Sequence, residues 1–147
     1  MHPAMEFIED SGPLLECYGE KVSFHDAEIN RIELRRGRTD LGEVFLDMDL
    51  HMFAVNGVDP ESGHYIFDMH CIASFQFESI QDLQLDGFNH QNAIMDLAID
   101  SLDPSTHNGA RLRVEIRPAF GVDASFSCCR CLLLKLQPGK PDGSVYP

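Results

Sequence analysis

Residues 43–77 read EVFLDMDLHMFAVNGVDPESGHYIFDMHCIASFQF, and they contain two runs in which apolar and polar residues alternate. Such alternation is typical of a β-strand with one face toward the core and one toward water. In Glu43–Phe53 the apolar positions are Val44, Leu46, Met48, Leu50 and Met52. Tyr65–Phe77 alternates over thirteen residues, which is long for a strand, so we expect a bulge or a bend within it. The turn formers between the two runs predict a hairpin.

Shorter alternating runs on both sides of this hairpin predict five more strands. They lie at about residues 29–35, 82–86, 95–100, 111–117 and 124–136, and the last is irregular around Cys128–Cys131. Helix is expected only within Pro3–Tyr18, where Ser11-Gly12-Pro13 divides the segment. The sequence therefore predicts a mainly β chain, a single-domain antiparallel β-sandwich or open curved barrel of about seven strands with a short N-terminal helical segment. Its expected parts are an N-terminal segment (1–23), a β core (24–136) and a loose, proline-rich tail (137–147).

Charge is distributed unevenly along the 147 residues. The chain has 24 Asp and Glu against 11 Lys and Arg, a net charge of −13. Lys and Arg are absent from residue 39 to residue 110. This composition disfavours a nucleic-acid binder, since phosphate affinity comes from clustered cations. The sequence shows neither an apolar run of membrane-spanning length nor a secretory signal at its start, so we expect a soluble, cytoplasmic protein without a membrane partner.

Seven aspartates should point outward if the strand assignments hold. They are Asp47, Asp49, Asp68, Asp82, Asp86, Asp96 and Asp100. We expect them to form one acidic sheet face that attracts a cationic protein partner. The alternative is that dispersed acids only keep the protein in solution.

The cysteines and histidines give no strong catalytic or metal motif. Cys128 and Cys131 have zinc-knuckle spacing, but residues three apart in a strand face opposite ways and no second CxxC follows, so buried free thiols are favoured. His51 and His70, beside Asp49 and Asp68, could hold a divalent ion across two strands, although a hydrated polar face is the preferred interpretation. Nucleophile elbows and phosphate loops are missing, so we predict neither an enzyme nor a cofactor.

Two polar clusters stand beside predicted strand ends, FHDAEI at 24–29 and GFNHQN at 87–92. Their polar candidates are His25, Asp26, Glu28, Asn89, His90 and Asn92. Asn, Asp and His often bond nearby backbone groups, so we favour caps that lock the strand ends. A small polar pocket for a ligand or metal is the alternative.

Three motifs occur in order and carry a resemblance. FHDAEI, LQLDGFNHQN (83–92) and RVEIRPAFGVDASFSC (113–128) are similar to motifs of the bacterial immunity-protein family numbered fifty, which is found beside polymorphic toxins. The resemblance spans roughly Phe24 to Leu136, while the 55–65 loop and the CCRC run have no counterpart in the pattern. It implies a small intracellular protein that binds and neutralises a cognate toxin, and it transfers no catalytic residue.

The leading hypothesis is a non-enzymatic binding module of the immunity type, which neutralises a basic toxin through an acidic sheet face. One alternative is a small-ligand or metal-binding domain that uses the polar clusters. Another is a homodimer through Phe45, Ile66 and Ile72, which are apolar residues on otherwise polar strand faces.

Overall fold

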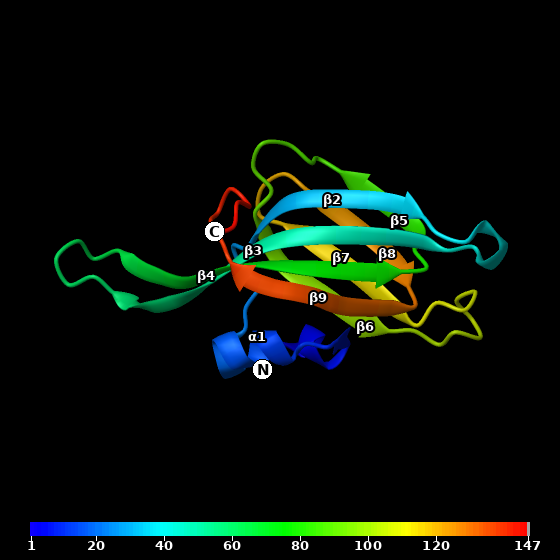
Figure 1. The fold of residues 1–147 in the computed structure, drawn as a ribbon, viewed down its shortest axis with the longest axis horizontal. Helices are drawn as coiled ribbons and strands as arrows, with labels where there is room; N and C mark the ends of the chain where they lie inside the picture. Colours follow the sequence, from blue (N-terminus) through cyan, green and yellow to red (C-terminus); the bar gives the residue numbers. More distant parts are fainter. Residues whose placement is uncertain (147) are drawn as a thin grey trace.

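Two β-sheets pack face to face in the computed structural model, which describes residues 1–146 (Figure 1). Strand accounts for 54% of the chain and helix for 12%, which confirms the mainly β prediction. The described part of the chain forms a sandwich and not a closed barrel. The five-stranded sheet has the order β1 (Ile8–Glu9), β9 (Arg130–Pro138), β4 (Tyr65–Glu78), β3 (Val44–Val58), β2 (Glu28–Arg36). The four-stranded sheet has the order β5 (Gln81–Asp86), β8 (Asp123–Cys128), β7 (Leu112–Pro118), β6 (Ile94–Ser101).

The N-terminal segment closes one side of the sandwich. Its β1 adds to β9 in parallel, and the 3-10 helix η1 (Pro3–Glu6) lies against β6, so the segment links the two sheets along this side. The helix α1 (Gly12–Tyr18) buries Leu14 and Tyr18. Two further 3-10 helices, η2 (Gly19–Lys21) and η3 (Thr39–Leu41), lie in connections. Within residues 1–146, no helix is both long and apolar enough to cross a membrane.

The centre of the core is aromatic. Phe75 and Phe77 point inward from β4 and are fully buried, as alternation predicts for this half of the strand. Phe77 meets Phe126 of β8 edge to face, with ring centroids 5.0 Å apart, and this contact joins the two sheets. Phe24, ahead of β2, packs against Phe75 at 6.3 Å. Edge-to-face pairs of this kind add specific attraction to the burial of apolar area.

The predicted last strand, 124–136, is in fact two strands in different sheets. β8 ends at Cys128 and β9 begins at Arg130, so the chain passes from the four-stranded to the five-stranded sheet at Cys129. The Cys129 N–H donates to the Glu78 carbonyl at 2.8 Å, which anchors the crossing to the end of β4. In one continuous strand, Cys128 and Cys131 would point to opposite faces. Because the turn at Cys129 places them in different sheets, both are fully buried.

The long strand predicted over 65–77 bends as expected, and its outer half leaves the core. Met69 has a left-handed φ of 54°, and the register with β3 shifts between Met52 and Ala54. Beyond these positions, residues 54–69 form a two-stranded projection that extends past the end of the sandwich (Figure 1). We call this projection the arm.

Of the expected loose tail (137–147), Gln137 and Pro138 belong to β9, residues 139–146 fold back onto the five-stranded sheet, and Pro147 lies outside the described residues. Gly139 donates its N–H to the His70 carbonyl and pairs with Val145. A Cβ at Gly139 would collide with Ile72, which is only 2% exposed.

The residues suggested for a homodimer interface are mostly covered. Phe45 lies under the Arg35 guanidinium, 4.4 Å from the ring centroid. Of the three residues suggested for a homodimer, Ile66 alone is exposed, since the other two are covered by their own chain.

The aromatic contact between the sheets gives a direct stability test. Phe126→Ala should lower the free energy of unfolding by about 3–5 kcal/mol, because it empties a fully buried site. Phe120→Ala is the matched control, since Phe120 is 61% exposed, and its effect should stay near 0.5 kcal/mol. Urea unfolding followed by circular dichroism measures both, and equal losses would contradict the assigned core.

Candidate functional site

The seven aspartates do not share a face. Asp47 and Asp49 lie on β3 in the five-stranded sheet, and Asp68 lies on the arm. The other four lie in the four-stranded sheet at opposite edges, Asp82 and Asp86 on β5 and Asp96 and Asp100 on β6. The prediction of one acidic sheet face is therefore wrong. Alternation distinguishes inward from outward positions, but it does not say which sheet a strand joins.

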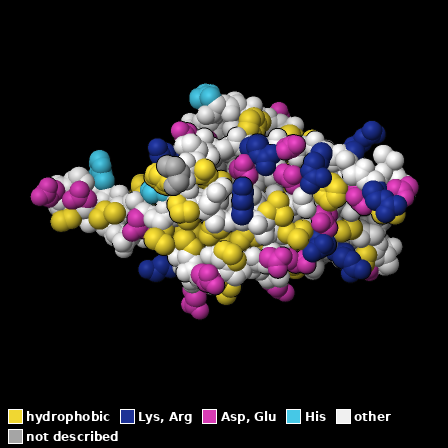
Figure 2. Space-filling model, in the orientation of Figure 1, with side chains coloured by type: hydrophobic (Ala, Val, Ile, Leu, Met, Phe, Trp, Pro, Cys, Tyr) yellow, Lys and Arg dark blue, Asp and Glu magenta, His cyan; other side chains and the backbone are white. Residues whose placement is uncertain are grey.

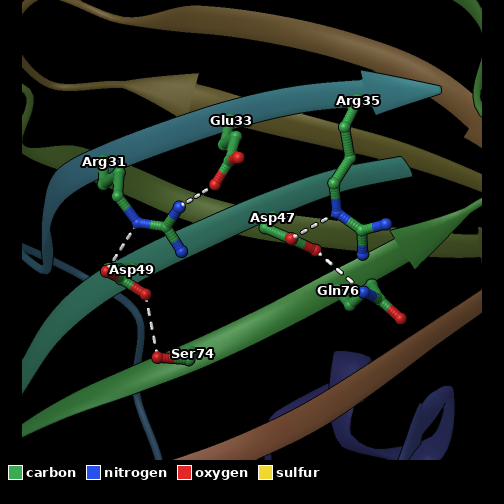
Figure 3. Close-up of polar contacts among 7 residues, drawn as sticks. All are labelled: Arg31, Glu33, Arg35, Asp47, Asp49, Ser74 and Gln76. Atoms are coloured by element: carbon green, nitrogen blue, oxygen red, sulfur yellow. Dashed lines mark hydrogen bonds and ion pairs between the residues drawn. The ribbon is translucent and has the colours of Figure 1, made fainter. Parts of the chain in front are cut away.

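Cationic partners from β2 neutralise the two aspartates on the outer face of β3. Arg31 lies opposite Asp49 in the register and donates to its carboxylate at 2.9 Å (Figure 3). Arg35 donates to Asp47 at 3.2 Å. Figure 2 shows Lys and Arg interspersed with Asp and Glu on this side of the molecule. The outer sheet face is a mixed ionic surface in which half-exposed arginines neutralise partly covered aspartates.

Polar residues of β4 complete these contacts. Ser74 donates to Asp49 at 2.8 Å, and Gln76 donates to Asp47 at 3.0 Å. Burial alone would raise the pKa of Asp49, but hydrogen bonds from Arg31 and Ser74 hold that pKa below its ordinary value. Both carboxylates are therefore engaged within the chain, which weakens them as attractors of a cationic partner.

The polar cluster at 87–92 forms a structural lock with the start of β2. Asn92 is buried and exchanges hydrogen bonds with the backbone of Asn89, at 2.9 Å and 2.8 Å. The Asn92 N–H donates to the Glu28 carboxylate at 2.7 Å. Gly121 crosses this loop so closely that a Cβ there would collide with the Gln91 carbonyl oxygen. These contacts support the favoured structural role for Glu28, Asn89 and Asn92.

The other predicted cluster members are less closely tied to this lock. His25 Nδ1 lies 3.0 Å from the Asp26 carboxylate, and both side chains are more than half exposed. Asp26 adopts a left-handed φ of 64° while its N–H donates to the Ile94 carbonyl. His90 is exposed in the same loop as Asn89. The six candidates thus divide into a lock around the buried Asn92, with Glu28 and Asn89, and three exposed side chains, His25, Asp26 and His90.

A groove runs along the base of the arm. It consists of two cavities of about 530 Å³ and 410 Å³, which share Asp26, Phe53 and Phe67. Phe53 and Phe67 meet edge to face with centroids 5.0 Å apart. We call this feature the arm groove, and its further lining includes Lys21, Ser23, His25, Glu28, His51, Val55, Tyr65, His70, Gln91 and Phe120. The sequence pattern singled out neither Phe53 nor Phe67 as a functional residue, and the unusual length of the 65–77 run was the one signal that part of it leaves the core.

A histidine pair lies in this groove. His51 Nε2 is 3.0 Å from His70 Nδ1, and the rings stack with centroids 5.2 Å apart. Burial, and secondarily the neighbouring His70, lowers the pKa of His51 to about 4. His51 is therefore neutral at pH 7, and in the pair one ring nitrogen donates and the other accepts.

The His51–His70 pair does not assemble the metal quartet that was considered as the alternative to a polar face. Asp49 bonds Arg31 and Ser74, and Asp68 accepts from Asn56 at 2.8 Å. In residues 1–146, no three His, Cys, Asp or Glu side chains converge as a metal ion would require. Neither aspartate is thus oriented as a ligand beside the two rings.

The arm itself carries a concentration of exposed apolar side chains. Their exposures range from 42% to 65%, and the residues are Val55, Val58, Tyr65, Ile66, Phe67 and Met69. Its loop carries the acids Asp59 and Glu61 and no Lys or Arg. Figure 2 shows this combination as apolar side chains along the arm and acidic ones toward its tip.

The lock predicts that the adjacent residues Asn92 and Gln91 contribute unequally to the unfolding free energy. Asn92→Ala should cost about 1–3 kcal/mol of unfolding free energy, because it removes both hydrogen bonds between the buried Asn92 side chain and the Asn89 backbone. Gln91→Ala, in the same loop but exposed, should change it by about 0.5 kcal/mol or less. Urea denaturation of the two variants compares them, and equal stability would exclude the lock.

The histidine pair predicts a pH dependence of stability. Unfolded histidine titrates near pH 6.5, as a rough reference, whereas His51 in the folded chain titrates at about 4. Below about pH 6.5 the unfolded chain therefore binds a proton that the folded chain resists, and unfolding free energy falls by up to about 1.4 kcal/mol per pH unit. The fall should end as pH passes through the folded pKa.

Comparison of unfolding at pH 7.5 and pH 5 in the wild type and in His51→Gln isolates this contribution. The variant should lose less stability on acidification, whereas His90→Gln, at an exposed position, should keep the wild-type dependence. An unchanged pH dependence in His51→Gln would show that His51 is not held neutral.

Comparison with known proteins adds no functional assignment to this geometry. No family model matches the chain, and neither curated proteins nor solved structures gave a match. The resemblance to the immunity-protein family stays a prediction from the three motifs. Any function must therefore be argued from the arm, the arm groove and their surroundings.

Proposed function

We propose that the chain is a non-enzymatic protein-binding module that docks a protein partner through the arm and the arm groove. The observation that carries this proposal is the placement of six half-exposed apolar side chains on a projection outside the core. An exposed apolar patch of this kind is typical of an interaction surface.

The arm gains little from its own apolar residues. Two strands without a covering layer are marginally stable in water, and the sandwich core is complete without Tyr65 and Phe67. Burial against a partner would stabilise each large apolar side chain by about 1.5–3 kcal/mol. Aromatic residues beside a groove are the common anchors of protein interfaces, so Tyr65 and Phe67 are assigned that role.

The charge near this surface favours a partner with a cationic rim. The arm carries Asp59, Glu61 and Asp68, and the groove adds Asp26 and Glu28 against one cation, Lys21. Negative potential of this type raises the association rate of a basic protein and contributes less to final affinity. The acids on the arm thus take the attracting role that the sheet aspartates were expected to have.

The immunity-type role is the specific form of this proposal. In it, the partner is a basic toxin domain, and the module acts by covering the toxin surface without chemistry of its own. The motif resemblance supports this version, and the apolar arm supplies a surface suited to it. A polar lipid surface fits less well, because the acidic tip of the arm would be repelled by anionic headgroups.

Site-specific cross-linking tests the docking surface. A photoreactive phenylalanine in place of Tyr65 should cross-link a second protein in the cells that produce the chain. The same group in place of Leu41, which is 62% exposed in η3 at the other end of the molecule, should not (Figure 1). The partner identified by mass spectrometry is then purified, and its affinity is measured by calorimetry.

The Tyr65→Ser/Phe67→Ser variant should weaken that affinity by about 100-fold or more, since two aromatic anchors are lost. Its unfolding free energy should change by about 1 kcal/mol or less, because both residues are exposed. Leu41→Ser should bind as the wild type does. Cross-linking mainly to a second copy of this chain, or unchanged affinity in the double variant, would overturn the proposal.

A further inference from the structure

Two cysteines from distant parts of the sequence meet where the arm joins the sandwich. Cys17 lies in the last turn of α1 and Cys71 lies on β4, two residues after the left-handed Met69. Their sulfur atoms are 3.9 Å apart, which is van der Waals contact between two free thiols. A disulfide needs about 2.0 Å between the sulfurs, so the two sulfur atoms must move closer together for a bond to form.

The surroundings of this pair hold it in place. The neighbouring Tyr18 hydroxyl donates to the Met69 carbonyl at 2.8 Å, which fixes the end of α1 against the base of the arm. Cys17 is partly exposed and Cys71 is nearly buried, so an oxidant in solution reaches Cys17 first. The other three cysteines lie together around the β8–β9 crossing, and Cys129 Sγ contacts the Gly109 carbonyl.

We propose that Cys17 and Cys71 are an oxidative modification site, which peroxide converts into a reversible disulfide that ties α1 to the base of the arm. This inference depends on the fold and is independent of the proposed binding function.

The reaction balances with one equivalent of hydrogen peroxide. The Cys17 thiolate attacks a peroxide oxygen, the O–O bond breaks, and Cys17 sulfenic acid forms with release of one water after proton transfer. Cys71 sulfur then attacks the Cys17 sulfur, the S–O bond breaks, and the hydroxyl leaves as water with the Cys71 proton. The two thiols are oxidised, and the peroxide is reduced to two waters.

The product would constrain the chain strongly. The bond would join residues 54 positions apart, and a loop of that size carries substantial closure entropy in the unfolded chain. Its expected signature is a rise in the thermal midpoint of about 5–15 °C. Reduction with dithiothreitol should reverse the rise.

The test exposes the purified full-length chain to hydrogen peroxide under native conditions. Burial, followed by the neighbouring Cys71, raises the pKa of Cys17, so the reaction is run at pH 9 to supply thiolate. Thiols are then alkylated in denaturant, and peptides are mapped by mass spectrometry. We expect a loss of two hydrogens, a Cys17–Cys71 linked peptide and the higher thermal midpoint.

Matched variants separate this bond from general oxidation. Cys17→Ser and Cys71→Ala should each abolish the linked peptide and the thermal shift, whereas Cys129→Ser, at another partly exposed cysteine, should retain both. Oxidation of Cys17 that ends at the sulfinic acid would overturn the proposal. Linkage through Cys128, Cys129 or Cys131, or a thermal shift that persists in Cys17→Ser, would overturn it as well.

Discussion

β4 is paired on both sides, with β3 and β9, and its inner side chains reach across the sandwich to β8. Phe75 and Phe77 are buried because the four-stranded sheet covers them, and that coverage ends before Met69. The two halves of β4 therefore lie in different environments. One half supplies the centre of the core, and the other continues as the arm with its apolar side chains in water.

The N-terminal segment and the loop lock keep the base of the arm in position. Tyr18 reaches the Met69 carbonyl from α1, and Cys17 lies against Cys71 on the adjoining part of β4. Beside the groove, Glu28 and Asn92 join the start of β2 to the loop before β6. A docking surface at the arm would thus be carried on a base tied by several independent elements, which limits the ordering cost of binding.

Counting charged residues along the sequence does not show which of them form ion pairs in the fold. A stretch without Lys or Arg suggested an unpaired acidic face, yet Arg31 and Arg35 lie outside that stretch in the sequence and beside its aspartates in the sheet. Register places them there, since β2 runs antiparallel to β3. The arm contains no Lys or Arg, and within residues 1–146 no basic strand lies alongside its acids.

Local patterning predicted the strands, the hairpin and the sandwich class, because alternation records which side of each strand is apolar. It also predicted the structural use of Asn89 and Asn92, whose side chains bond the nearby backbone. It failed at Cys129, where a single-residue turn moves the chain between sheets. It also gave no sign that Phe67, which alternates in step with the buried Phe75 and Phe77, is 51% exposed. Local patterning does not show which strands are neighbours, where the four-stranded sheet stops covering β4, or which distant side chains meet. The arm groove and the Cys17–Cys71 contact were therefore decided only by the tertiary structure. The sequence by itself determined the apolar content of the arm, whereas the packing of the two sheets determined that this content faces water.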